Sequence, residues 1–127
     1  MTTISIPYRL LLALPLWLLA LPGNATPESA TRTEIAGLMQ ALQASGCRFQ
    51  RNGTWYDAAQ ARSHLQRKYD YLLKRDLVTS TERFIELAGS RSSMSGRAYK
   101  VSCNGSAEQD AAGWFSQQLQ QLRRTRR

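Results

Sequence analysis

The pattern of apolar and polar positions predicts a first helix that begins near residue 31. The segment Thr31-Arg32-Thr33-Glu34 has the capping-box pattern of a helix start, and Gly46 is a natural stop. Between them, apolar residues recur at helical spacing, at Ile35, Leu38, Met39 and Leu42. We therefore expect a helix of about three turns in this segment.

Residues 47–56 have the pattern of a β-hairpin. Asn52-Gly53 lies between two short runs that carry aromatic residues, which is the strongest short-range hairpin signal. With these two residues as the turn, the expected cross-strand pairs are Arg51 with Thr54, Gln50 with Trp55, and Phe49 with Tyr56. Trp55 then lies on the face opposite Phe49, where packing under a helix is favoured over exposure as a recognition aromatic.

A second helix is predicted directly after the hairpin. Asp57 with Gln60 gives it a capping box, and the pattern continues to about Arg75. Its apolar stripe consists of Ala61, Leu65 and Leu72. Lys68 falls within this stripe and His64 on its flank. The favoured interpretation is structural: a partly buried histidine bonded to the backbone, and a lysine whose stem passes along the apolar stripe.

A further capping box, Thr79-Ser80-Thr81-Glu82, predicts a short third helix that ends at Gly89. Its inward residues are Phe84, Ile85 and Ala88.

The last part of the chain reads as a strand, a turn and a helix. Tyr99 to Cys103 alternates as a strand does, and Asn104-Gly105 turns the chain. The last helix is expected to start at about Ser106 and to pack through Ala111, Phe115, Leu119 and Leu122, with Trp114 at the margin. The order αββααβα predicts an α+β domain in which about four helices pack on a small antiparallel sheet, made of the hairpin and one later strand.

Composition sets the N-terminus apart from this domain. Arg9 precedes the apolar run of residues 10–22, and small residues follow it, as in a cleavable signal peptide. Pro15 and Pro22 interrupt the run, which falls short of the roughly 20 apolar residues of a spanning helix. We expect a signal peptide at residues 1–25, a cut after Ala25, a single domain at residues 26–127, and a periplasmic mature protein.

Cys47 and Cys103 are the two cysteines of the chain. An exported protein meets an oxidising compartment, so we expect a disulfide between them. Two distant cysteines and one histidine make a poor zinc site, and we expect neither a metal nor a cofactor.

The expected disulfide also fixes a strand register. If the later strand runs antiparallel to the first strand of the hairpin, Phe49 lies opposite Val101 and Arg51 lies opposite Tyr99. All four side chains then share the core-facing side of the sheet. Arg51 and Tyr99 lie at its edge.

The formal net charge is +8, and part of it gathers at the C-terminal end. The basic tail, residues 123–127, carries Arg123, Arg124, Arg126 and Arg127. On an exported protein such a tail fits anionic lipid or another acidic envelope surface better than nucleic acid, so we expect no nucleic-acid partner and at most peripheral membrane contact through the tail. The alternative is a solvated helix end whose arginines suit the helix dipole.

Four motifs occur in order along the chain: FQRNG, SHLQRK, TSTERFIELAGS and SSMSGRAYKV. In sequence and spacing they resemble the YfeK-like family of small exported bacterial proteins, a domain of unknown function. The resemblance covers about half of the mature chain and implies a secreted or periplasmic location. It supplies no established activity.

Residues 90–99, SRSSMSGRAY, form the serine loop, which is the candidate binding segment. Its hydroxyls, backbone N–H groups and arginines are able to surround a phosphate, sulfate or carboxylate. The alternative is a structural loop in which the serine hydroxyls bind backbone groups, which is the commoner role of serine in turns.

His64 and Lys68 lie four residues apart on one helical face and are able to reach the same place. A serine of the loop close to His64 would make a nucleophile and base pair, as in a hydrolase. No Gly-x-Ser-x-Gly or Ser-x-x-Lys motif supports that reading, so we lean towards no enzymatic activity. An inhibitor of an envelope-directed enzyme is a further alternative.

The sequence therefore predicts a binding or accessory module of the cell envelope that carries out no chemistry. Its ligand or partner is expected to be anionic. The candidate ligand-binding residues are Arg51, Asn52, His64, Lys68, Ser90, Ser92, Ser93, Ser95, Gly96 and Tyr99.

Overall fold

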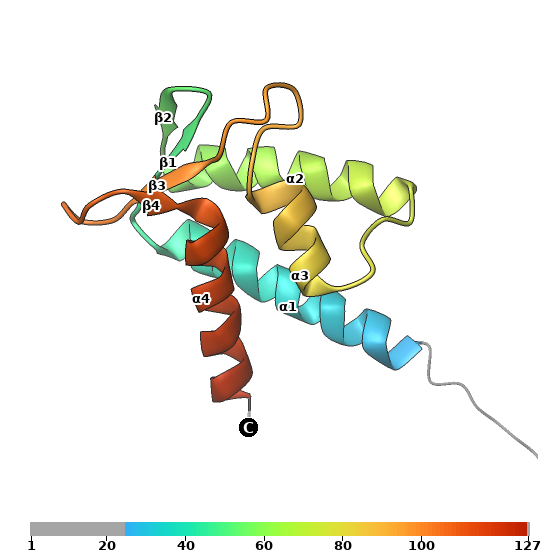
Figure 1. Ribbon diagram of the computed structural model, residues 1–127. Coiled ribbons are helices and arrows are strands. Elements are labelled where there is room, and N and C mark those ends of the chain that lie inside the picture. The colour runs from blue at the N-terminus through green and yellow to red at the C-terminus, as the bar shows by residue number, and fades with distance from the viewer. Residues whose placement is uncertain (1–24, 127) are drawn as a thin grey trace, which may run out of the picture.

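A computed structural model describes residues 25–126 of the chain. The helices are α1 (Ala25–Ala44), α2 (Ala58–Lys74), α3 (Thr81–Phe84), which continues as the π-helical turn η1 (Ile85–Gly89), and α4 (Ala111–Thr125). The strands are β1 (Arg48–Arg51), β2 (Thr54–Tyr56), β3 (Lys100–Ser102) and β4 (Gln109–Asp110). The sheet lies at one end of the helices, and α4 leads away from it past α1 (Figure 1). This arrangement confirms the α+β prediction.

The predicted signal peptide and its cut lie outside the described residues, apart from Ala25, and remain predictions. Within residues 25–126, no helix combines the length and the apolar character that crossing a membrane requires.

The predicted hairpin is confirmed pair by pair. Phe49 lies opposite Tyr56, Gln50 opposite Trp55, and Arg51 opposite Thr54. Asn52 and Gly53 have φ values of 51° and 84°, which the two central positions of a type I′ turn require. Trp55 is half-buried and outside the core, so the prediction that it packs as a core residue holds only in part.

The sheet has the order β2-β1-β3-β4, with antiparallel neighbours. The disulfide between Cys47 and Cys103 is present, and Phe49 lies opposite Val101 as the predicted register requires. Continued by two residues, the same register brings Arg51 to the level of Tyr99, which is buried.

Strand β4 was not predicted, and because of it the last helix begins later in the chain than expected. Gln109 pairs with Val101, and the Ala111 N–H donates to the Tyr99 carbonyl. The sheet therefore holds the segment expected to be helical from Ser106, and α4 begins only at Ala111. Trp114, expected at the margin, is buried against Phe49 and Phe115.

The predicted start of the first helix is wrong. Helix α1 begins at Ala25, and the Thr31–Glu34 segment lies inside it. The Glu34 carboxylate is buried and accepts hydrogen bonds from Thr81, Arg123 and Arg126 instead of capping its own helix. These partners come from α3 and the C-terminal end of α4, so the sequence pattern around residues 31–34 gives no sign of them.

The second helix agrees with its prediction, and the third is displaced by one residue. Asp57 caps α2 in a complete capping box with Gln60, and Leu65 and Leu72 are buried. In α3, Ser80 rather than Thr79 is the cap, since the Ser80 hydroxyl accepts the Arg83 N–H. The π-helical turn that follows has no counterpart in the prediction.

The basic tail begins within the folded helix. Arg123 binds Glu34 and Glu82, and Arg126 binds Glu34, so these two charges are neutralised within the protein (residues 25–126). Arg124 is exposed.

Candidate functional site

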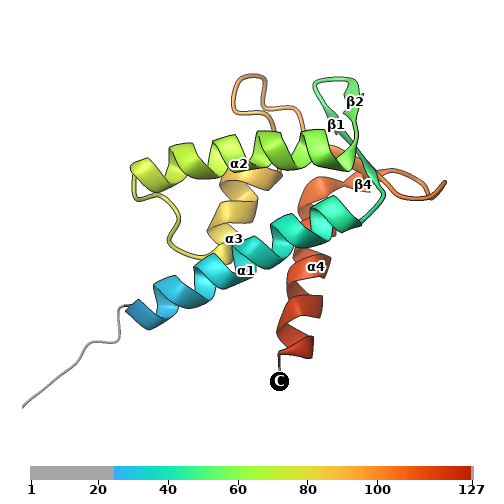
Figure 2. The same ribbon diagram turned by 180° about the vertical axis from the view of Figure 1, so that it is seen from behind.

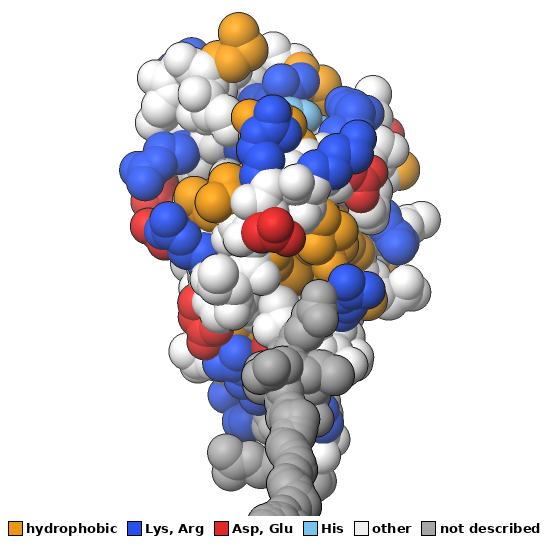
Figure 3. All heavy atoms as spheres, turned by 90° about the vertical axis from the view of Figure 1, so that its right-hand side faces the viewer, with side chains coloured by type: hydrophobic (Ala, Val, Ile, Leu, Met, Phe, Trp, Pro, Cys, Tyr) orange, Lys and Arg blue, Asp and Glu red, His pale blue; other side chains and the backbone are white. Residues whose placement is uncertain are grey.

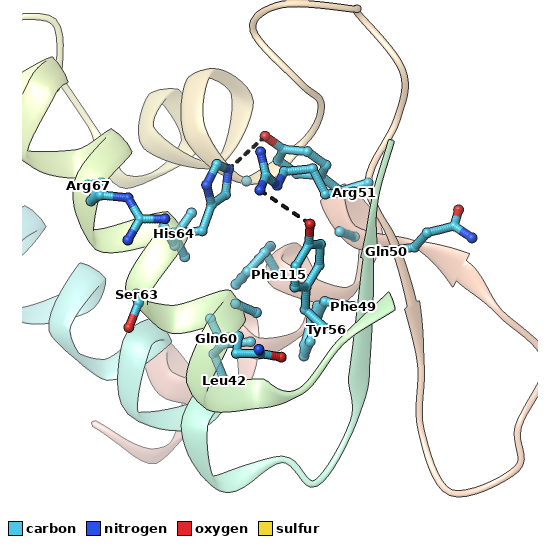
Figure 4. Close-up of a pocket in the computed structure, with 15 residues that line it drawn as sticks. Leu42, Phe49, Gln50, Arg51, Tyr56, Gln60, Ser63, His64, Arg67 and Phe115 are labelled. Atoms are coloured by element: carbon cyan, nitrogen blue, oxygen red, sulfur yellow. Dashed lines mark hydrogen bonds between the residues drawn. The ribbon is translucent and has the colours of Figure 1, made fainter. Parts of the chain in front are cut away.

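A pocket of about 310 Å³ lies between α2 and the β1–β2 hairpin. Its floor consists of apolar side chains from the core: Leu42, Phe49, Ala61, Leu65, Ala111 and Phe115. Its polar lining includes Arg51, Tyr56, His64, Arg67 and Tyr99. In Figure 4 the Arg51 and His64 side chains lie at one end of the pocket, Tyr56 extends beside Phe115 towards Arg51, and Leu42 lies at the other end.

Three predicted site residues meet at one oxygen atom. The Tyr99 hydroxyl lies 3.1 Å from His64 Nε2 and accepts a hydrogen bond of 3.1 Å from Lys68 Nζ. The same Lys68 ammonium donates to the Arg91 carbonyl at 3.0 Å and lies over the Tyr99 ring. Lys68 therefore joins α2 to both ends of the serine loop, at Arg91 and at Tyr99.

Arg51 completes this group from the hairpin. Its guanidinium lies over the Tyr56 ring, 5.3 Å from the ring centroid, and donates a hydrogen bond of 3.4 Å to the Tyr56 hydroxyl. A cation over an aromatic face keeps its full charge. No described ion pair neutralises Arg51.

The electrostatics of the pocket follow from this crowding of cations. Burial, followed by the charges of Arg51, Lys68 and Arg67, lowers the pKa of His64 to about 4. Burial and Arg51 likewise lower the pKa of Lys68 to about 8, and burial raises the pKa of Tyr99. His64 is thus a neutral imidazole at pH 7, and its Nε2 is able to accept a hydrogen bond from the Tyr99 hydroxyl.

No Asp or Glu is among the residues that line the pocket in the described part of the chain. Figure 3 shows the single histidine of the chain among several Lys and Arg side chains, with hydrophobic surface nearby. Uncompensated positive charge above an apolar floor favours an anion that also has an apolar body.

Most serine-loop hydroxyls point into the protein. Ser92 is buried, and its Oγ accepts the N–H groups of Met94 and Ser95. Ser90 Oγ donates to the Ile85 carbonyl, and Ser95 Oγ donates to the Asn52 side chain. These contacts support the structural alternative for the loop. Ser93 is exposed.

Asn52 also has a structural position. Its amide nitrogen donates to Ser92 Oγ at 3.3 Å, while its oxygen accepts from Ser95 at 2.5 Å. The hairpin turn and the serine loop are therefore joined side chain to side chain.

Seven of the ten predicted site residues fall into two groups. Arg51, His64 and Tyr99 line the pocket, and Lys68 binds Tyr99 at its edge. Ser92, Ser93 and Gly96 line a separate hollow beside Glu86, Leu87 and Arg91. In the described part of the chain, the hydrogen bond of His64 goes to Tyr99 and not to a loop serine, so no Ser–His pair is assembled here.

Sequence reasoning missed Tyr56, Gln60 and Arg67 as site residues, and it assigned the residues of the floor to the core without predicting a pocket beside them. The hairpin register could have identified Tyr56, because it lies opposite Phe49, which was assigned to the core face of the sheet. Arg67 follows His64 by three residues, which places it on the same side of α2. The floor depends on α4 packing under the sheet, for which no local pattern exists.

A family model with the description "Family of unknown function (DUF5329)" matches residues 29–123 of the chain. The matched range contains the whole pocket. No curated protein matches, and no solved structure matches.

Proposed function

Because the chain belongs to the DUF5329 family, whose function is unknown, we propose a role from its pocket: a non-enzymatic binding module for a small organic anion with an apolar body. The observation that carries this proposal is the composition of the pocket, in which Arg51 and Arg67 lie above an apolar floor without an acidic residue. Ligand sites typically combine a mostly apolar lining with a few oriented polar groups.

The pocket supplies donors that suit a carboxylate or phosphate. Arg51 presents a guanidinium, whose planar set of N–H donors matches either anion. Lys68 holds the Tyr99 hydroxyl, which holds the His64 ring, so the polar wall is ordered before a ligand arrives. Preorganisation of this kind reduces the entropy lost on binding.

A hydrolase has less support. Ser90, Ser92 and Ser95 use their hydroxyls within the fold, and His64 binds Tyr99. Of the serines, Ser63 lines the pocket, but it is adjacent to His64 in α2, and adjacent helical positions do not face each other.

The cellular setting is also part of the proposal. The N-terminal signal-peptide pattern and the disulfide support export to the periplasm, and the motifs around Arg51, His64 and Tyr99 support membership of a YfeK-like group. We place the binding module in the cell envelope on these grounds.

Binding of octanoate and octyl phosphate, measured by calorimetry, tests the proposal. Octanol is the probe without charge, and inorganic phosphate is the probe without an apolar body. We expect the amphipathic anions to bind at least tenfold more tightly than either, and Arg51→Ala to weaken them about tenfold or more, because it removes a charge-assisted hydrogen bond.

Arg124→Ala is the matched control, since it removes an exposed arginine far from the pocket. Equal binding of octanol and octanoate, or unchanged binding in Arg51→Ala, would contradict the proposal.

A further inference from the structure

The serine loop and the hairpin turn project from the same end of the molecule. Figures 1 and 2 show both segments beyond α2, on the side away from the end of α4. We call residues 91–97 together with Asn52 and Gly53 the docking tip. The pocket proposal uses none of these residues.

Met94 is the outermost apolar residue of the docking tip, with 96% of its surface exposed. The other large hydrophobic residues that are exposed in the described chain range from 38% to 54%. Because it is almost fully exposed, the Met94 side chain contributes nothing to the packing of this domain. This exposure therefore points to a surface that the side chain enters.

The tip is held in one shape. Ser92 Oγ accepts the Met94 N–H, the Ser92 carbonyl accepts the Gly96 N–H, and the Ser92 N–H donates to the Arg97 carbonyl. Asn52 binds Ser92 and Ser95 from the hairpin. Little backbone freedom is therefore left to lose when Met94 docks.

The charged side chains within the serine loop and the hairpin are all basic, and the neighbouring Glu86 is paired with Arg83. Arg91 and Arg97 are exposed within the serine loop, and Arg97 approaches the hairpin turn closely enough for a side chain at Gly53 to contact its guanidinium. Residues 90–99 and 47–56 contain no Asp or Glu. Anionic phospholipid attracts arginines near its surface, and an apolar side chain between them is able to reach the acyl boundary.

We propose that the docking tip binds the surface of an anionic phospholipid bilayer, with Met94 inserted and Arg91 and Arg97 at the headgroups. The contact predicted for the basic tail thereby moves to the opposite end of the molecule. Arg123 and Arg126 are engaged by Glu34 and Glu82, whereas Arg91 and Arg97 have no acidic partner among the described ion pairs.

Co-sedimentation of the mature chain, residues 26–127, with lipid vesicles tests this proposal, because all described elements from α1 to α4 lie within or at the edge of that range. The vesicles contain about 30% phosphatidylglycerol in phosphatidylcholine, with pure phosphatidylcholine as the neutral comparison. We expect binding to the anionic vesicles that falls steeply as the salt concentration rises. Arg97→Ala should lower the partition coefficient about fivefold.

Met94→Ser should lower the partition coefficient roughly tenfold, because insertion depends on apolar surface. Met94→Leu should leave the partition coefficient unchanged, because it keeps an apolar side chain of similar size. The matched controls are Arg124→Ala for charge and Leu77→Ser for an exposed apolar residue outside the tip, and both should leave partitioning unchanged. Circular dichroism confirms that each variant is folded.

Any one of four results would overturn the proposal. Two concern the vesicles: equal binding to neutral and anionic vesicles, or no binding to either. Two concern the variants: an equal effect of Arg97→Ala and Arg124→Ala, or no effect of Met94→Ser. Arg51→Ala and the octanoate measurement report on the pocket, so failure of the docking tip and failure of the pocket are distinguishable.

Discussion

The Tyr99 hydroxyl oxygen lies 3.1 Å from His64 Nε2, although 35 positions separate the two residues in the chain. This contact joins the residue that precedes β3 to α2, and both side chains line the pocket. Cations surround it: Lys68 binds the same oxygen, and the charges of Arg51 and Arg67 act on the ring. Burial and these cations together favour the neutral form of the histidine.

The titration of His64 should reveal this environment. Its pKa is about 4 in the folded protein, against a usual value of 6.5, because of burial and neighbouring positive charge. The unfolded chain consequently binds more protons between these two values, so the free energy of unfolding should fall as the pH decreases from about 6.5 to about 4. The His64 ring signals in NMR should shift only as the pH approaches 4.

Arg51→Ala should raise the pKa of His64, because it removes the largest of the charge effects on the ring. Arg124→Ala should leave the titration unchanged. A His64 ring that titrates near 6.5 in the wild-type protein would refute the buried, cation-rich site.

Local sequence signals predicted the hairpin and its register because Asn52-Gly53 determines the turn and the disulfide aligns β1 with β3. They also placed Arg51 and Tyr99 together. They misplaced the start of α1, since the Glu34 carboxylate is used by α3 and α4 rather than by its own helix. The spacing of Thr31 and Glu34 suggested a capping box, but Glu34 could not serve in one, because its carboxylate is bound to Thr81 and Arg123.

The serine loop shows the same limit for the site. Its composition suited both an anion site and a structural loop, because serine hydroxyls serve either purpose. What separates the two readings is the direction of each hydroxyl, which depends on Asn52, some forty positions earlier. No spacing within the loop encodes that contact.

Ser92 and Ser93 should respond differently to alanine substitution. Ser92→Ala removes the acceptor for Met94, Ser95 and Asn52 from a buried position, and we expect the free energy of unfolding to fall by about 1–3 kcal/mol. Ser93→Ala changes an exposed side chain, and we expect a change within about 0.5 kcal/mol. Urea unfolding measures both. Equal effects would show that Ser92 does not organise the loop.

Export should remove the N-terminal segment of the chain. The apolar run between Arg9 and Gly23 and the small residues after it predict cleavage after Ala25. Expression in a Gram-negative host followed by osmotic release should yield a periplasmic protein whose first residue is Thr26. Replacing Leu12 and Leu14 by arginine should retain the full-length chain in the cytoplasm. Recovery of the unprocessed chain with the membrane fraction would indicate an anchor instead.

The buried Glu34 carboxylate should stabilise the fold in a pH range of its own. Hydrogen bonds from Arg123, Thr81 and Arg126 hold its pKa at about 2, below the usual 4.5, despite the opposing effect of burial. Since the unfolded chain binds more protons between these values, this stabilisation is present above about pH 4.5 and should be lost as the pH falls towards 2.

Glu34→Gln should therefore lower the free energy of unfolding at pH 7 by about 1–3 kcal/mol and flatten its pH dependence below pH 4.5. The dependence between pH 6.5 and 4, assigned to His64, should remain. Urea unfolding at several pH values separates the two ranges, and Glu86→Gln, on an exposed pair with Arg83, is the control with little effect. An unchanged slope below pH 4.5 in Glu34→Gln would show that Glu34 does not link α1 to α4 in this way.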